Sequence, residues 1–123
     1  QTEFTHLTEN IIFNELISRG YNVDVGIVEL NEKDSEGKSV RRQLEVNFVA
    51  ARGSRKFYIQ SAYSMADAEK QWQEKRSLTH IDDSFSKIII TREAAKPHFD
   101  DSGMYLLPLR DFLLNADALE RIG

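Results

Sequence analysis

Cysteine is absent from the 123-residue chain, which excludes a disulfide framework and a thiolate metal site. No apolar run is long enough to form a transmembrane helix, and the hydrophobic fraction of 41% is ordinary for a globular protein. The chain also lacks a GxxxxGKS/T phosphate-binding loop, so any ATPase activity would have to lie outside it. These features predict a single cytoplasmic domain, residues 1–123, with no membrane partner.

The beginning of the chain lacks an initiating methionine and the basic and apolar regions of a signal peptide. We therefore expect the sequence to be a piece of a longer polypeptide. The three histidines are far apart and lack the spacing of metal ligands.

A global positive field is missing too, because the net charge is -4 and the pI is near 5.4. Nonspecific nucleic-acid binding of the kind driven by overall charge is thereby disfavoured. Positive charge does gather locally around residues 41–56. We take four of these side chains as candidate nucleic-acid-binding residues, although the same charges could simply solvate strand ends and turns: Arg41, Arg42, Arg52 and Arg55.

The segment from Arg41 to Ala62 has the clearest pattern, typical of two strands joined by a short turn that contains Gly53. Period-two alternation places Glu45 and Asn47 on one face of the first strand. By the same rule, Gln60 shares a face of the second strand with Tyr58 and Ala62. Many metal-dependent nucleases hold Mg²⁺ with oxygen ligands on two such strands, so Glu45, Asn47 and Gln60 are candidate site residues.

The remaining pattern predicts an α/β fold with strands and helices in a definite order. A helix over residues 5–19 precedes a strand over 21–30 and a polar loop over 31–39. After the two strands come a helix over 66–77, a buried strand over 87–91, an extended piece over 104–109 and a short helix over 110–114. The later helix and strand indicate a crossover back into the sheet.

Apolar residues cover more of the surface of the helix over 5–19 than a single buried stripe would. Phe13 and Ile17 in particular predict burial on more than one side. Glu9 falls within this apolar surface, where a carboxylate must be paired, bound to a ligand or at the rim. Trp72 lies on an otherwise charged helix, and we expect it to anchor that helix in the core.

Five segments between about Phe4 and Asn115 carry a family resemblance: LTENIIFNELISRGYNVDVG, RRQLEVNFVA, FYIQSAYSM, AEKQWQEKRSLTHIDDSFSKIIITRE and GMYLLPLRDFLLN. In this order they resemble the C-terminal domain of a large group of bacterial and archaeal AAA-type ATPases. Those proteins combine an N-terminal ATPase module with a domain of the PD-(D/E)XK nuclease superfamily. The resemblance implies a restriction-endonuclease-like core, in which an antiparallel three-strand meander belongs to a mixed sheet flanked by helices. It also implies an N-terminal ATPase domain as partner.

The superfamily pattern places its helix glutamate at Glu9, its metal-binding aspartate at Asn47 and its second acid at Gln60. The lysine position of that pattern falls at Ala62. Two carboxylates are thus replaced by amides and the lysine by a methyl group, whereas Mg²⁺ is normally held through one or two carboxylates. Metal-assisted hydrolysis also needs positive charge at the transition state, which the lysine commonly supplies.

Three functions remain open from the sequence. The first is an accessory nuclease-like domain that is catalytically impaired or inactive and serves in protein interaction or regulation. The second is a Mg- or Mn-dependent DNA nuclease with an altered ligand set, for which the metal candidates are Glu9, Glu45 and Asn47. The third is a module that binds DNA without cutting it. No cofactor is required under the first reading.

Overall fold

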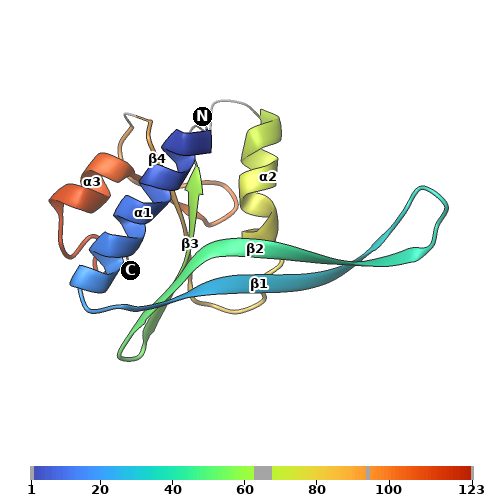
Figure 1. The fold of residues 1–123 in the computed structure, drawn as a ribbon, viewed down its shortest axis with the longest axis horizontal. Helices are drawn as coiled ribbons and strands as arrows, with labels where there is room; N and C mark the ends of the chain where they lie inside the picture. The colour runs from blue at the N-terminus through green and yellow to red at the C-terminus, as the bar shows by residue number, and fades with distance from the viewer. Residues whose placement is uncertain (1, 63–67, 94, 123) are drawn as a thin grey trace.

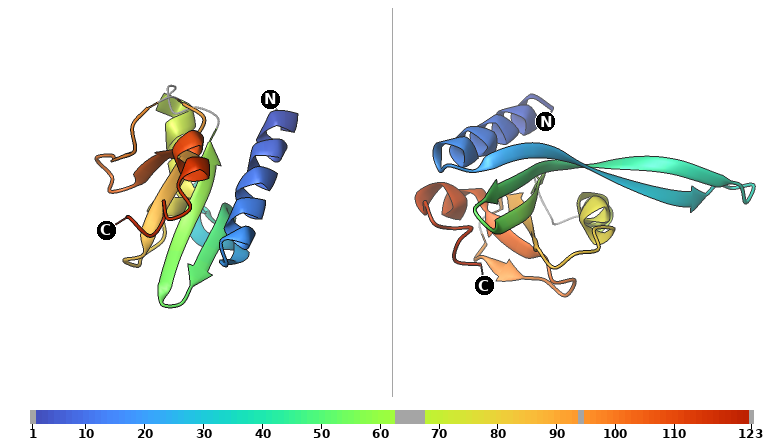
Figure 2. Two further views of the ribbon diagram at one scale, coloured as in Figure 1. Left: turned by 90° about the vertical axis from the view of Figure 1, so that its left-hand side faces the viewer. Right: turned by 90° about the horizontal axis from the view of Figure 1, so that it is seen from below.

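A mixed six-stranded sheet with the strand order β1-β2-β3-β4-β6-β5 forms the centre of the computed structural model. The structure describes residues 2–62, 68–93 and 95–122. Helices α1 (Thr2–Ser18) and α3 (Leu109–Leu114) pack on one face of the sheet, and α2 (Ala68–Thr79) packs on the other (Figures 1 and 2). The coarse prediction of an α/β sheet flanked by helices is confirmed.

The first three strands form an antiparallel meander: β1 (Asn22–Lys33), β2 (Ser39–Arg52) and β3 (Arg55–Ala62). After α2, the chain returns as β4 (Ser86–Thr91), which pairs parallel to β3. Strand β6 (Tyr105–Pro108) then pairs parallel to β4, and the two-residue β5 (His98–Phe99) lies antiparallel at the edge. The parallel return of the chain after α2 is the crossover that the sequence predicted.

Two hydrophobic clusters fill the two faces of the sheet. The first core lies beneath α1 and α3, and its buried side chains include Ile12, Leu16, Phe48, Phe57, Ile88, Ile90 and Phe112. The second core lies beneath α2 and consists of Val46, Tyr58, Ala62, Leu78, Ile89 and Met104. Because successive residues of β4 enter opposite cores, its Ile88, Ile89 and Ile90 are all buried.

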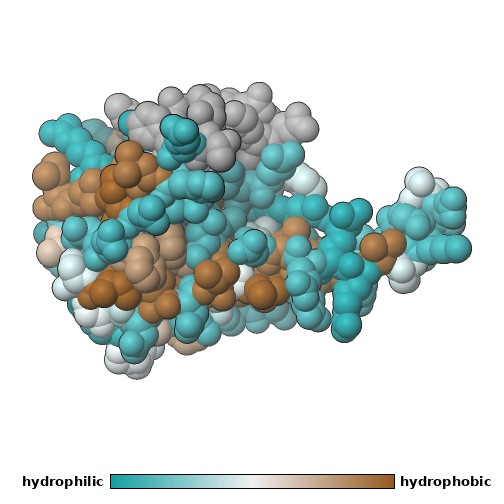
Figure 3. Space-filling view, viewed as in Figure 1, coloured by the Kyte–Doolittle hydropathy of each residue, from teal (hydrophilic) through white to brown (hydrophobic). Residues whose placement is uncertain are grey.

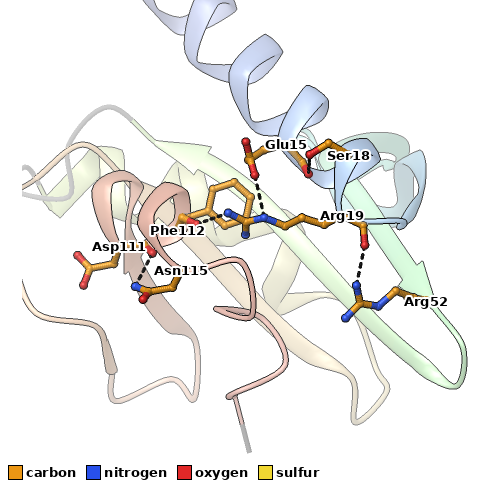
Figure 4. Close-up of polar contacts among 7 residues, drawn as sticks. All are labelled: Glu15, Ser18, Arg19, Arg52, Asp111, Phe112 and Asn115. Carbon is orange, nitrogen blue, oxygen red and sulfur yellow. Dashed lines mark hydrogen bonds and ion pairs between the residues drawn. The ribbon is translucent and has the colours of Figure 1, made fainter.

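Arg19, just after α1, ties the two helices of the first core together (Figure 4). Its Nη2 donates a hydrogen bond of 2.6 Å to the carbonyl of Phe112, and its guanidinium lies 4.4 Å from the centre of the Phe112 ring. Glu15 accepts from its Nε at 2.9 Å. Arg52 at the end of β2 in turn donates to the Arg19 carbonyl at 2.6 Å.

The segment that follows α3 belongs to the first core, although the sequence pattern did not reveal it. It buries Ala118, Leu119 and Ile122. Glu120 accepts a 2.6 Å hydrogen bond from the Tyr21 hydroxyl and lies 3.3 Å from Arg52. Burial, the hydrogen bond and the charge of Glu120 together raise the pKa of Tyr21 to about 12.

The far halves of β1 and β2 form a two-stranded arm that projects from the body of the molecule (Figure 1). The predicted polar loop over residues 31–39 is shorter than expected, because β1 continues to Lys33 and β2 begins at Ser39. Asp34 closes the turn by accepting from the backbone N–H groups of Glu36 and Lys38, each at 2.9 Å. Cross-strand pairing therefore extends through a segment that is polar in sequence.

Two burial predictions are wrong. Phe13 and Ile17 of α1 are 41% and 48% exposed, so this helix buries only the side that carries Ile12 and Leu16. Trp72 of α2 is 61% exposed and stacks with Arg76, whose guanidinium lies 5.1 Å from the ring centre. The helix predicted over 66–77 extends to Thr79, and its expected start lies outside the described residues. No described helix is long and apolar enough to cross a membrane.

Candidate functional site

A β-bulge interrupts β2 at the position of Asn47. Asp24 pairs with Val49 and Gly26 pairs with Val46, so two residues of β2 lie opposite the single residue Val25. Val46 and Val49 consequently both reach the second core, which unbroken alternation would not allow. The expected common face of Glu45 and Asn47 assumed unbroken alternation, and the bulge removes that assumption.

Asn47 and Gln60 meet where β2 and β3 stop pairing through their backbones. Gln60 Oε1 accepts a 2.7 Å hydrogen bond from the backbone N–H of Asn47, and Asn47 Oδ1 accepts a 2.8 Å bond from the backbone N–H of Ser61. The last backbone pair before this point is Phe48 with Ile59. These two reciprocal bonds, which we call the amide clasp, replace ladder bonds at the diverging strands.

Gln60 also connects the sheet to α2, on the face shared with Tyr58 and Ala62 as predicted. Its Nε2 donates to Ser77 Oγ at 3.1 Å and to the Glu74 carbonyl at 3.4 Å. Gln60 is only 7% exposed, and Ser77 is buried as well. A neutral amide suits this position because it supplies both an acceptor and donors, whereas an ionised carboxylate supplies acceptors alone.

The clasp gives a structural role to the two amides that the sequence resemblance suggested as metal-ligand positions. Each side-chain oxygen already accepts from a backbone N–H, and neither group carries the negative charge that favours Mg²⁺. Ala62, at the pattern's lysine position, packs in the second core at 3% exposure. The contacts of Asn47 and Gln60 thus hold β2, β3 and α2 together.

In the described part of the chain, the carboxylates expected near this site form none of the hydrogen bonds of the clasp. Glu45 is exposed and pairs in register with Ile27 of β1. Glu9 is half-buried on α1. Among the described residues, no group of three or more histidine, aspartate and glutamate side chains is placed to hold a metal ion.

A small pocket beside the clasp was not foreseen. It includes Ser61, and its other lining residues are Thr5, Thr8, Ala62 and Arg92. Hydroxyl-bearing residues of α1 and β3 thus line the pocket together with one arginine, and none of its described lining residues carries a carboxylate. Scattered threonine and serine residues with no motif spacing give no sequence signal for such a pocket.

The four arginines proposed for nucleic-acid binding fall into two separate pairs. Arg41 and Arg42 lie on the arm, where they pair with Glu29 at 3.6 Å and Glu32 at 2.7 Å. Glu32 also forms an ion pair with Arg76 of α2.

Arg52 ends β2 and Arg55 begins β3, about 30 Å away from the first pair at the usual rise per residue of a strand. Both face Glu120, at 3.3 and 3.7 Å, and Arg55 also donates to the Ile122 carbonyl at 3.0 Å. The four side chains therefore do not form one basic surface, and each has an acidic partner.

Comparison with known proteins gives one informative match. A protein of Haemophilus influenzae that carries the description "Uncharacterized protein" is 34% identical over 88 residues. The match covers 72% of this chain and 18% of that protein, so the chain spans less than a fifth of its relative. No family model matches the chain, and no solved structure matches it.

Proposed function

We propose that this chain is a non-catalytic, nuclease-like accessory domain of an AAA-type ATPase and that it acts as a protein-interaction module. The order of its elements supports the proposal. A helix, an antiparallel three-strand meander, a second helix and a strand parallel to β3 follow one another as a restriction-endonuclease-like core requires.

The observation that carries the non-catalytic reading is the amide clasp. A cation at Asn47 and Gln60 would compete for side-chain oxygens that satisfy two backbone N–H groups. Leaving a buried N–H group unsatisfied costs about 1–3 kcal/mol. The neutral amides offer less electrostatic attraction to a divalent cation than two carboxylates would. Ligand chemistry and structural role thus both oppose metal binding.

The accessory role rests on the family resemblance and on the length of the relative, in which the matched segment is a small part of a much longer protein. We propose an N-terminal ATPase domain as the partner. The separation of the four arginines and their pairing with Glu29, Glu32 and Glu120 favour protein interaction over DNA binding.

The test is calorimetric titration of Mn²⁺ into the chain, followed by a plasmid-nicking assay. We expect neither saturable heat nor nicking from the unaltered protein. The double variant N47D/Q60E carries two carboxylates in place of the amides and should bind Mn²⁺. Q73E, which adds one charge on the exposed side of α2, is a control that should not.

The opposite result would be Mn²⁺-dependent nicking by the unaltered chain that disappears in N47A and Q60A. It would establish a working nuclease and overturn the non-catalytic proposal. Circular dichroism of each variant separates a lost site from a lost fold.

A further inference from the structure

Strand β1 leaves its outer edge without a strand partner in the described part of the chain. It pairs with β2 on one side only, over the twelve residues Asn22–Lys33. An uncovered edge offers a row of backbone N–H and C=O groups to another strand. Val25 and Ile27, near the middle of β1, are 60% and 61% exposed.

These two side chains lie on the face of the sheet that carries α1. Val23, two residues earlier, packs against the first core, and alternation places Val25 and Ile27 on the same side. Gly26 and Val28 take the opposite side: a Cβ on Gly26 would come within 2.8 Å of Val49, and Val28 packs against the second core.

The exposed part of α1 continues this apolar surface. Phe13 lies over Phe48, with 6.4 Å between the ring centres, and Phe48 is one of the two residues opposite Val25. Ile17 follows one turn later on α1. Figure 3 shows hydrophobic residues exposed over α1 and along β1. Phe13, Ile17, Val25 and Ile27 together form what we call the apolar strip.

We propose that a second copy of this chain covers the strip by pairing its β1 antiparallel to this β1, with Gly26 on the two-fold axis. In this register, Val25 lies opposite Ile27 of the second copy, and Ile27 lies opposite its Val25. Both exposed side chains then gain an apolar neighbour on the same face, while the unpaired backbone groups gain hydrogen bonds. The strips of the two copies meet on one side of a continuous sheet.

Two other nearby registers are less favourable for the same residues. An axis at Ile27 would place Val25 opposite Glu29, and an axis at Val28 would place Asp24 opposite Glu32. The first register places the apolar Val25 beside a carboxylate, and the second places two negative charges opposite each other. The charge of -4 on each chain adds repulsion between copies, so association should strengthen as salt screens that repulsion.

Sedimentation velocity over a concentration series tests the surface. We expect a reversible dimer that becomes tighter from low to moderate salt. V25K/I27K should be monomeric and folded, because both side chains are exposed in the single chain. L114K places one lysine on the exposed α3 side chain Leu114, away from the strip, and should dimerise as the unaltered chain does.

The register has its own test, because the chain has no cysteine and each introduced thiol is therefore unique. Directly opposite residues have Cβ atoms about 4.5–5.5 Å apart, whereas diagonal positions are about 7–8 Å apart. Only the former approach disulfide geometry. A mixture of V25C and I27C chains should form mixed disulfides at least several-fold faster than either variant alone.

A monomer at every concentration would overturn the proposal. The strip would then have to be covered by something other than a second copy, such as another part of a longer polypeptide. A dimer that persists in V25K/I27K would place the interface elsewhere. Equal rates of like and mixed disulfide formation would reject the register, even if V25K/I27K failed to fold.

Discussion

The parallel part of the sheet and the edge strand β1 differ in how much of each strand is exposed. In β3 and β4, every residue beyond the first two is buried, because helices cover both faces. Strand β1 alternates between exposed and half-buried residues along almost its whole length and has no fully buried residue. The two regions belong to one sheet, yet hydrophobic burial stabilises the first much more than the second.

This difference separates the residues that maintain the fold from those available for interaction. The parallel part contains the clasp residue Gln60 and contributes side chains to both cores, among them Ile59 and Ile89. The arm is held by cross-strand bonds and by the ion pair from Glu32 to Arg76. Substitutions in the parallel part should therefore change stability, and those on the exposed face of β1 should change association.

The largest expected effect is the difference in unfolding free energy between two isoleucine-to-alanine substitutions, one in each region. Ile89→Ala in β4 removes a fully buried side chain from the second core and should lower the free energy of unfolding by about 2–5 kcal/mol. Ile27→Ala in β1 removes a side chain that is mostly in water and should cost less than about 0.5 kcal/mol in the monomer. Urea unfolding at low protein concentration measures both.

Low concentration matters because Ile27 belongs to the proposed dimer contact. If the two substitutions cost the same amount in the monomer, the division of the sheet into a stabilising parallel part and an exposed edge strand would be wrong.

A smaller effect is expected at the clasp. Gln60→Glu keeps the acceptor for the Asn47 N–H but loses the donor to Ser77 and turns a carboxylate toward the Glu74 carbonyl. We expect a loss of about 1–3 kcal/mol at neutral pH. Burial raises the pKa of such a carboxyl, so the folded state binds its proton more tightly than the unfolded state does. The variant should therefore lose stability as pH rises above the unfolded-state pKa.

The measurement is urea unfolding of Gln60→Glu at several pH values between 4 and 8. Gln73→Glu on the exposed side of α2 is the matched control and should show little pH-dependent loss. A Gln60→Glu variant as stable as the parent at pH 8 would show that the clasp contributes little.

Sequence patterns foresaw the elements whose burial depends on local periodicity. The run from Ile88 to Ile90 identified a strand buried on both faces. Helical spacing in α1 marked four apolar residues, of which Ile12 and Leu16 are buried, whereas Leu7 and Ile11 are exposed. The predictions that succeeded did so because a strand in a covered sheet and a helix on its surface repeat with fixed periods. The candidate residues Asn47 and Gln60 were also expected to lie near each other, as they do.

What the sequence did not reveal depends on contacts between distant segments. The bulge at Asn47 is an extra residue in one strand relative to its neighbour, and it appears only once the register with β1 is known. Trp72 is exposed because α2 packs through Leu78 and Ser77 instead. Glu120 faces Arg52 across the fold, a pairing that no local pattern encodes.

The smallest expected effect tests the anchored end of β1, where the exposed strand joins the core. Tyr21 precedes β1, and its hydroxyl donates to Glu120. Because the folded-state pKa of Tyr21 is raised from 10.0 to about 12, the folded state keeps this proton longer than the unfolded state, and stability should fall between these pH values.

Glu120→Gln removes the charge but leaves Tyr21 buried, so the pKa of Tyr21 should fall part of the way toward its ordinary value and the alkaline loss of stability should become smaller. At neutral pH the variant should lose only on the order of 1 kcal/mol, since Arg52 and Arg55 are partly exposed. Absorbance titration of the tyrosines, with Tyr21→Phe to assign the signal, measures the shift. An unchanged titration in Glu120→Gln would mean that burial alone sets the pKa and that Glu120 does not fix the start of β1.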